Sequence, residues 1–429
     1  MADRALERFE ALFGPEFGHG KAFELTGLRG ALSALGEPHT NLAPTIHVAG
    51  TNGKGSTIAF MRAIAEAAGL RVHAFTKPHL HRLQARFLVT GAAINDDALI
   101  AAAERVHAVA PKLTQFDAQV AAAFLLFSEA PADLVLLETG MGGRDDSTNL
   151  IAAPALSVIT PIALDHGDVL GESLSAIAAH KAGILKPNTP AIIARQSPEA
   201  RDVIEAEAAR VGAPLFRHGA EWDAYANAGR LVVQTETRTL DLPLPTLNGA
   251  HQIDNAGLAC AALLNWRDFD EGAFAAGVTW ARLPARLQAL TRGPFSAPIR
   301  ASGGEVWVDA GHNAHAARAL AQALQHMKAR RPAPTIAIVG LRARKDAGEF
   351  IAALAQGIDQ IIAAPLGDDH IAPSQLVALA QQQNINATTA PSLAAAMQNA
   401  ALLPAPRVLI CGSFLLAAEA LAAESAQKI

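Results

Sequence analysis

The chain has 429 residues, of which 51% are hydrophobic and 17% are charged, and its formal net charge is −5. The length exceeds what one hydrophobic core usually serves, and the apolar content excludes a largely disordered chain. The mildly negative charge argues against a protein that binds nucleic acid through a broad basic surface, so we expect no nucleic-acid partner.

The amino terminus and the cysteines predict a cytoplasmic protein. Met1–Phe13 carries charges of both signs and lacks the basic start and apolar run of a signal peptide. The two long stretches without charged side chains are broken by prolines and polar residues, so neither predicts a membrane span. Two cysteines, Cys260 and Cys411, cannot build a disulfide framework and predict buried free thiols.

The first part of the chain alternates short β-branched runs with alanine-rich helical runs, which predicts an α/β domain with a mostly parallel sheet. The predicted strands are Thr45–Ala49, Arg71–Phe75, Leu134–Leu137, Ala155–Thr160 and Ala191–Ala194. The predicted helices are Gly55–Ala68, Phe116–Ser128, Leu174–Ala182, Arg201–Arg210 and Gln252–Leu264. Alternating side chains within Arg230–Leu242 predict an antiparallel excursion near the end of this domain.

Prolines and glycines between Leu283 and Gly304 interrupt this pattern, which predicts a linker there. We place the first domain at 1–285, the linker at 286–304, and a smaller Rossmann-like α/β domain at 305–429. In that second domain the predicted strands are Glu305–Asp309, Thr335–Gly340, Gln360–Ala363 and Val408–Gly412. Its predicted helices are Ala314–Lys328, Ala347–Gln356, Pro373–Gln382 and Leu415–Ala426.

A glycine-rich segment, Gly50–Thr57, follows the first predicted strand and leads into a helix pattern. Glycines let backbone N–H groups turn toward a phosphate, the helix N-terminus adds positive potential, and Lys54 can reach the β- and γ-phosphates. The spacing departs from the generic P-loop, because Val48 stands at the first glycine position and Gly55 separates Lys54 from Ser56. We predict ATP binding here.

A carboxylate and a lysine offer further chemistry. Glu138 ends a predicted strand, where parallel sheets place their ligands, and its oxygens suit Mg²⁺. Taken alone, Lys181 is an ordinary lysine near a helix end, and His166 is more often a structural residue than a ligand. Polar residues at the ends of strands or helices on both sides of the linker suit a site that closes on a ligand; they are Asn255, Arg286, Asp309 and His312.

Taken together, these residues resemble the folylpolyglutamate synthases, in their bacterial bifunctional form with dihydrofolate synthase activity, among the Mur-type ATP-dependent amide ligases. The resemblance runs from about Phe23 to Leu416. The segments that carry it are His47–Ser56, Pro78–Leu80, Glu138 with Gly142–Arg144 and Thr148–Asn149, Leu164–His166, Lys181–Ile184, Asp309 with His312–His315, and Cys411–Ser413.

The resemblance implies a C–N bond-forming ligase that adds L-glutamate to dihydropteroate or to reduced folates through an acyl phosphate, working as a monomer. It implies ATP and two Mg²⁺ ions as cofactors, with a monovalent cation as a further candidate. The residues that match ATP contacts are Asn52, Gly53, Lys54, Gly55, Ser56, Asn255, Arg286 and Asp309. Those that match metal ligands are Glu138, His166 and Lys181, the last as a CO₂-carbamylated lysine.

The same resemblance places the other two substrates. His312 and Ser413 match positions associated with the incoming glutamate. The segments that match the pterin and aminobenzoate pocket are Phe23–Leu28, Thr114–Asp117 and Asp145–Ser147, with Glu24, Leu25, Thr114, Phe116, Asp117 and Asp146 as the candidate contacts.

Three segments depart from the family pattern. Lys77 stands where the family has the serine of a Ser-Pro-His-Leu loop that touches the first magnesium. We expect this lysine either to displace a metal ligand or to swing away, with Ser56 or water completing the shell. The other two departures, Leu25–Arg29 and Asp145–Ser147, fall in the predicted folate pocket.

Three alternatives stay open from the sequence. A ligase for UDP-muramyl acceptors would need an extra N-terminal domain, and the phosphate loop begins by Gly50. A kinase-type P-loop protein would place Ser directly after the loop lysine and would have no use for Lys181 or Asp309. The third alternative is a decayed ligase that only binds nucleotide, and Lys77 is the best argument for it.

Overall fold

The computed structural model describes residues 3–16, 24–367 and 369–425. The chain folds into two compact units. Unit 1 comprises Met1–Thr246 and Ile253–Arg282, and unit 2 comprises Leu247–Gln252 and Leu283–Ile429. None of the helices in the described ranges is long and apolar enough to cross a membrane.

Unit 1 is built on an eight-stranded sheet of order β4-β3-β2-β5-β1-β6-β7-β8. The strands are β1 Thr45–Ala49, β2 Val72–Phe75, β3 Phe87–Val89, β4 Ala92–Ala93, β5 Leu134–Glu138, β6 Leu156–Ile159, β7 Ala191–Ile193 and β8 Leu215–Arg217. The run from β2 to β8 is parallel, whereas β3 and β4 add an antiparallel edge. All residues of β1 and β5 are buried, as expected where helices cover both faces.

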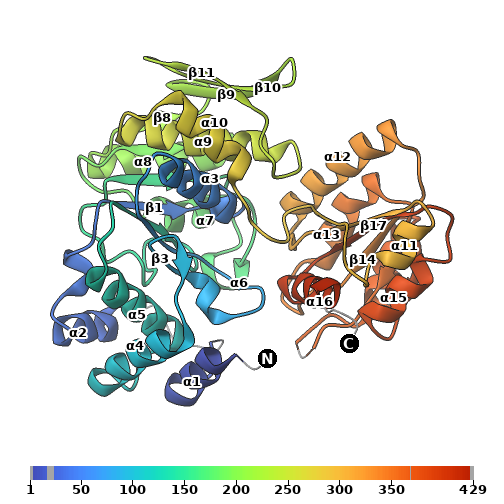
Figure 1. Cartoon of the computed structure of the whole chain (residues 1–429), viewed down its shortest axis with the longest axis horizontal. Helices are drawn as coiled ribbons and strands as arrows, with labels where there is room; N and C mark the ends of the chain where they lie inside the picture. The colour runs from blue at the N-terminus through green and yellow to red at the C-terminus, as the bar shows by residue number, and fades with distance from the viewer. Residues whose placement is uncertain (1–2, 17–23, 368, 426–429) are drawn as a thin grey trace. The chain divides into compact units, whose positions relative to one another are not determined.

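Helices cover this sheet on both sides (Figure 1). They are α1 Arg4–Phe13, α2 Thr26–Ala34, α3 Lys54–Ala67, α4 Asp96–Val109, α5 Gln115–Glu129, α6 Gly167–Leu170, α7 Leu174–Ala182, α8 Pro198–Val211, α9 His251–Trp266 and α10 Glu271–Trp280. One core joins α1, α2, α4 and α5 to the sheet through Phe75, Val135 and Leu137. On the other side α3 packs against α10 so closely that a Cβ on Gly277 would lie 2.4 Å from the Ile64 backbone.

The predicted antiparallel excursion is confirmed as part of a separate three-stranded sheet. It consists of β9 Trp222–Asn227, β10 Arg230–Thr235 and β11 Thr239–Pro243 in the order β11-β10-β9. Leu231 and Val233 are buried while Arg230 and Gln234 are exposed, which is the alternation that predicted it. The strand β9 was not predicted.

Unit 2 contains a six-stranded sheet of order β12-β13-β17-β14-β15-β16. Its strands are β12 Gln288–Leu290, β13 Glu305–Val308, β14 Thr335–Val339, β15 Gln360–Ala363, β16 Asn386–Thr389 and β17 Arg407–Cys411. Its helices are α11 Ala297–Ala301, α12 Ala314–Arg330, α13 Ala347–Leu354, α14 Pro373–Gln382, α15 Leu393–Ala400 and α16 Phe414–Ser425. Every pairing is parallel except that of β12 with β13.

The segment predicted as a linker is largely folded. Its residues form β12 and α11, and β12 pairs antiparallel with β13 from Gln288↔Val308 to Leu290↔Val306. The prolines and glycines that suggested a linker therefore punctuate the first elements of unit 2. The chain passes into unit 2 at Leu283, and the short segment Leu247–Gln252 also belongs to that unit.

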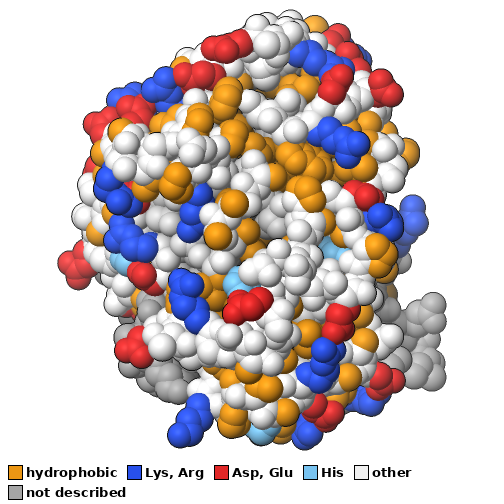
Figure 2. Space-filling view, turned by 90° about the vertical axis from the view of Figure 1, so that its left-hand side faces the viewer, with side chains coloured by type: hydrophobic (Ala, Val, Ile, Leu, Met, Phe, Trp, Pro, Cys, Tyr) orange, Lys and Arg blue, Asp and Glu red, His pale blue; other side chains and the backbone are white. Residues whose placement is uncertain are grey.

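Charged side chains of both signs are interspersed on the face shown in Figure 2 rather than gathered into an area of one sign. Partly exposed ion pairs of unit 1 include Arg71–Asp133 and Arg217–Glu221. Such exposed pairs contribute little to stability. With both signs interspersed, this face has no large area of one charge that would attract an oppositely charged partner.

Candidate active site

The phosphate loop connects β1 to α3 and bends at two glycines. Gly50 has φ 144° and Gly53 has φ 93°, both in the region that favours glycine. The Lys54 ammonium folds back over the loop and donates to the carbonyl oxygens of Gly50 and Thr51, at 3.2 and 3.3 Å. The helix starts at Lys54, one residue earlier than predicted, so Ser56 and Thr57 lie buried in its first turn. The N–H groups of this turn and Lys54 form a cradle suited to phosphates.

Asn255, on α9, lies against the phosphate loop. A Cβ added to Gly53 would lie 2.5 Å from the Asn255 side-chain oxygen, so the two residues touch only because position 53 has no side chain. Asn255 is 4% exposed. Asn255, which the sequence predicts as a nucleotide contact, therefore lies next to the phosphate loop.

Glu138 ends β5, beside the phosphate loop. Because β1 and β5 run in parallel with Val48 opposite Glu138, the carboxylate emerges at the same sheet edge as the loop. It lies 3.8 Å from the Lys54 ammonium and accepts a 3.1 Å hydrogen bond from the Lys77 backbone N–H. Its side chain is 4% exposed. A buried carboxylate next to the phosphate cradle offers hard oxygen ligands for a divalent cation.

Lys181 reaches the phosphate loop from the last turn of α7. Its ammonium donates a 2.7 Å hydrogen bond to the Gly50 carbonyl oxygen. Burial, together with the nearby Lys54 ammonium, lowers the pKa of Lys181 to about 7, although Asp165 and Asp146 oppose the change. An amine with this pKa is substantially neutral near neutral pH, and a neutral amine is a nucleophile.

His166 opens the short helix α6 with φ 56°, a left-handed backbone conformation that is uncommon outside glycine. Its backbone N–H donates to Asp165 Oδ1 at 2.9 Å, and its ring is 35% exposed. Among the described residues there is no group of three or more His, Cys, Asp and Glu side chains that could hold a metal ion. Unmodified side chains of the described chain therefore do not form a complete metal shell.

The predicted acceptor residues on α5 and the following loop meet in one place. Thr114 caps α5 and donates to Asp117 Oδ2 at 2.6 Å, while Ser147 donates to Asp117 Oδ1 at 2.6 Å. The Phe116 ring packs so tightly on Gly140 that a Cβ there would lie 2.2 Å from it. The loop after β5 is thus held against the start of α5.

Asp146 holds this loop together rather than facing outward. Its Oδ2 accepts from the Met141 N–H at 2.7 Å, and its Oδ1 accepts from both the N–H and the hydroxyl of Thr148. The residue is 2% exposed. Its contacts fit a residue that shapes the loop.

The amino-terminal pocket residues are less tightly placed. Glu24 is exposed, and Leu25 is half-buried at the start of α2, against the core that α1, α2, α4 and α5 share. Phe23, where the predicted pocket segment begins, lies outside the described residues.

Sequence reasoning missed a buried ion-pair cluster beside these residues. Arg86 binds both carboxylate oxygens of Glu16, at 3.0 and 2.9 Å, and Lys77 lies 3.3 Å from the same carboxylate. Lys77 drew attention as a departure from the family pattern, but Glu16 and Arg86 are 70 positions apart and carry no local signal. The expectation that the Lys77 side chain swings away fits this ion pair, in which the ammonium lies beside Glu16 while the backbone N–H donates to Glu138.

In unit 2, the predicted site residues surround the end of β13. Asp309 is 5% exposed and accepts from the backbone N–H groups of Leu287 and Gly311, at 2.7 and 2.6 Å. Arg286 lies 5.2 Å from the centroid of the Phe414 ring. The His312 ring lies 5.8 Å from the same phenylalanine.

Two further residues complete this part of unit 2. Ser413 precedes α16, is 3% exposed and accepts from the Leu415 N–H at 3.0 Å. Sequence reasoning missed His251, whose ring nitrogen Nδ1 is buried. Burial is the main cause of its lowered pKa; the charge of Asp309 opposes this change and that of Arg286 adds to it. The structure thus brings Arg286, Asp309 and His312 together.

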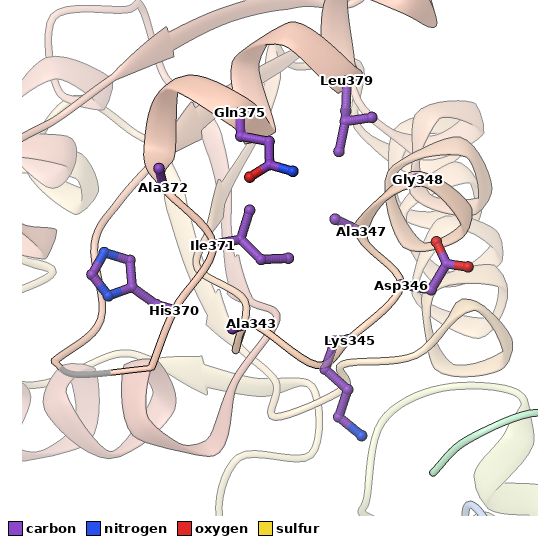
Figure 3. A pocket seen from close by; sticks show the side chains of 10 residues that line it. All are labelled: Ala343, Lys345, Asp346, Ala347, Gly348, His370, Ile371, Ala372, Gln375 and Leu379. Atoms are coloured by element: carbon purple, nitrogen blue, oxygen red, sulfur yellow. The ribbon is translucent and has the colours of Figure 1, made fainter. Parts of the chain in front are cut away.

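Unit 2 also contains a cavity of about 520 Å³ that none of the predicted site residues lines. Figure 3 shows Ile371, Ala347 and Gln375 turned into it, whereas the charged end of Lys345 points away. The Asp346 carboxylate is likewise turned away, because it caps α13 by accepting from the Glu349 N–H. The lining mixes apolar side chains with Lys345, Asp346, His370 and Gln375, and it includes none of the residues predicted to bind a substrate.

Two family models match the chain, the Mur ligase middle domain over residues 48–263 and the Mur ligase glutamate ligase domain over residues 297–414. The dihydrofolate synthase/folylpolyglutamate synthase of Escherichia coli is 33% identical over 402 residues, covering 92% of this chain and 90% of its own.

Solved structures agree with these matches. The Escherichia coli FolC in complex with DHPP and ADP has a TM-score of 0.86 at 31% identity, over 98% of this chain and 97% of its own. A bifunctional folylpolyglutamate synthase/dihydrofolate synthase with Mn, AMPPNP and L-glutamate bound has a TM-score of 0.85 at 29% identity, over 99% and 98%. The predicted fold class, a P-loop ATPase domain with a mostly parallel sheet and a Rossmann-like second domain, is confirmed.

Proposed function

The chain belongs to the Mur ligase family, and we propose that it is a bifunctional ligase that uses ATP to join L-glutamate to dihydropteroate and to folates. The observation that carries this is the likeness over nearly the whole chain to dihydrofolate synthase/folylpolyglutamate synthases, one of them solved with a nucleotide and L-glutamate bound. The alternatives of a UDP-muramyl ligase and of a decayed homologue are not favoured, because the relatives that match both units are folate ligases.

In the proposed reaction the acceptor carboxylate attacks the γ-phosphate of ATP, forming an acyl phosphate and releasing ADP. The glutamate amine then attacks the acyl carbon, loses a proton, and expels phosphate. Carboxylate and phosphate repel one another, so catalysis depends on placed positive charge. Lys54 supplies it at the phosphate loop, and Arg286 is proposed as a second cation for the nucleotide.

Glu138 and His166 would hold magnesium, and the buried Glu138 carboxylate beside the loop fits that use. Bound there, magnesium would neutralise phosphate charge and orient the reacting oxygens. Among the described residues, no three His, Cys, Asp or Glu side chains are arranged to hold a metal ion by themselves. We therefore propose that nucleotide, water and a carbamylated Lys181 complete the ligand set, and that the two magnesium sites and the monovalent cation of the family extend to this chain.

Carbamylation of Lys181 has support in its environment. Its pKa of about 7 leaves a neutral amine whose nitrogen can bond to the carbon of CO₂ and release one proton. The product is a carboxylate in place of an ammonium. That change removes the repulsion between Lys181 and Lys54 and adds oxygen ligands beside Gly50.

Residues of unit 2 are proposed for the nucleotide and for glutamate, and residues of unit 1 are proposed for the acceptor. Asp309 and Arg286 contact the nucleotide, and His312 and Ser413 contact the incoming glutamate. Thr114, Phe116 and Asp117 line the acceptor pocket with Glu24 and Leu25. Asp146 acts on the pocket through the loop that it shapes.

We further propose that the protein acts as a cytoplasmic monomer without a nucleic-acid partner. The test of the main proposal is glutamate-dependent phosphate release with dihydropteroate, tetrahydrofolate and a UDP-muramyl acceptor in parallel, with products identified by mass spectrometry. Glutamylated pterins are expected from the first two acceptors. Turnover of the UDP-muramyl acceptor alone would overturn it.

A further inference from the structure

The buried cluster around Arg86 contains two cations for one carboxylate. Arg86 spreads its donors over Glu16, the Gln119 side-chain oxygen at 2.6 Å, and His79 Nδ1 at 2.9 Å. Lys77 is the second cation, with its ammonium 3.3 Å from Glu16. Arg86 binds both oxygens of Glu16 while Lys77 lies beside the same carboxylate, so two cations share one negative charge.

Lys77 differs from Arg86 in having a face left for a ligand. The Arg86 side chain is 3% exposed, whereas that of Lys77 is 16% exposed. The Lys77 ammonium lies 4.2 Å from the centroid of Phe116, a residue of the predicted acceptor pocket. An ammonium over an aromatic face, next to one shared carboxylate, is poised to bind a further anion.

The backbone and the side chain of Lys77 contact two different parts of the proposed site. Its N–H donates to Glu138, which belongs to the phosphate side of the site, while its side chain runs to Phe116 on the acceptor side. Asp146, the other carboxylate that attracts Lys77, has both oxygens engaged by its own loop. The ammonium therefore lies beside the region where an acceptor would extend from the pterin pocket toward the phosphate loop.

We propose that Lys77 is a specificity-determining residue that binds the non-reacting carboxylate of a glutamylated acceptor. The inference rests on the proposed function. Dihydropteroate carries one carboxylate, which is the reacting group, whereas a folate carries a second one on its glutamate. Lys77 therefore favours folates over dihydropteroate.

The experiment compares the KM values for tetrahydrofolate, dihydropteroate and ATP in the wild type, Lys77→Ser and Lys77→Arg. In Lys77→Ser the KM for tetrahydrofolate is expected to rise roughly tenfold, the size of one lost charge-assisted hydrogen bond, while the other two KM values change by about twofold or less. In Lys77→Arg the KM for tetrahydrofolate is expected to stay close to the wild-type value. Arg82→Ser is the matched control, since it removes a cation from the same loop whose side chain is exposed and pairs with Asp96 instead of Glu16.

Each result bears on one of the two proposals. Equal changes in both acceptor KM values, no change in either, or a wild type that accepts only dihydropteroate would overturn the role of Lys77. A wild type that glutamylates neither acceptor overturns the proposed function instead. Thermal melting of each variant separates a loss of fold, because a purely structural Lys77 would lower the melting temperature and move all three KM values together.

Discussion

Lys181 donates a hydrogen bond to the Gly50 carbonyl oxygen, and the same oxygen also accepts from Lys54. Burial is the main cause that lowers the pKa of Lys181 to about 7, and repulsion between the two ammonium groups on one carbonyl is the second. The loop that is to hold phosphates therefore has one fixed cation and one amine that loses its proton easily. This pairing links the phosphate loop to helix α7.

Carbamylation of Lys181 should depend on pH in a defined direction. The group is protonated below about 7 and neutral above it, so reaction with CO₂ should increase as the pH rises through that value. Enzyme depleted of CO₂ should regain glutamate-dependent activity when bicarbonate is added, more strongly at pH 8 than at pH 6. Lys181→Ala should show no bicarbonate response. A wild-type activity that is indifferent to bicarbonate at both pH values would contradict the modification.

Lys54→Ala should abolish glutamate-dependent ADP release. The ammonium bonds to two carbonyls of the phosphate loop, and loss of one preorganised charge contact typically costs about 100-fold in kcat or more. Circular dichroism should be unchanged, because the Lys54 ammonium bonds to the loop carbonyls and lies near Glu138 rather than packing in the hydrophobic core. Lys112→Ala, at an exposed position, serves as the control. Full turnover in Lys54→Ala would remove the phosphate-loop assignment.

The phosphate loop was predictable because its signal is local: a buried strand, glycines, a lysine and a helix follow one another within a few residues. The cluster of Glu16, Lys77 and Arg86 was not, because its members come from three separate segments and meet only through the fold. No periodicity or motif encodes an ion pair across 70 positions.

The same contrast explains the folded linker. The composition of residues 286–304 carries the local signs of an irregular connection, which is why a linker was predicted there. What the local pattern does not contain is the partner strand. Pairing of Gln288–Leu290 with β13 adds an antiparallel edge to the unit 2 sheet, and that pairing is decided by tertiary contacts.

Gly53→Ala tests the contact between the phosphate loop and α9. A methyl group at this left-handed position would be strained and would collide with Asn255. The KM for ATP should increase roughly tenfold, in line with a distortion of about 1–2 kcal/mol. Gly30→Ala is the matched control, because a Cβ there meets nothing within 4 Å. An unchanged KM for ATP in Gly53→Ala would show that the loop tolerates the side chain.

Lys77→Ser should leave the magnesium dependence of activity nearly unchanged, because the side chain pairs with Glu16 rather than with Glu138. The Mg²⁺ concentration for half-maximal activity is the quantity to measure, at saturating acceptor. A large decrease in that concentration would mean that Lys77 displaces a metal ligand that serine restores.

Glu16 should make the protein sensitive to acid. Burial alone would raise the pKa of Glu16, but Lys77 and Arg86 outweigh it and lower that pKa to about 2. A carboxylate whose pKa is depressed in the folded state stabilises the fold at pH values above its unfolded-state pKa, and this contribution is lost as the pH falls from about 4.5 toward 2.

Glu16→Gln should destabilise the protein at neutral pH by roughly 3 kcal/mol, since it leaves Arg86 and Lys77 without their shared carboxylate. It should also flatten the pH dependence of the unfolding free energy in this window, measured by urea denaturation at a series of pH values. Glu104→Gln, which breaks an exposed pair with Arg8, should do neither. If both variants lose stability in parallel as the pH falls, the buried carboxylate does not govern the acid response.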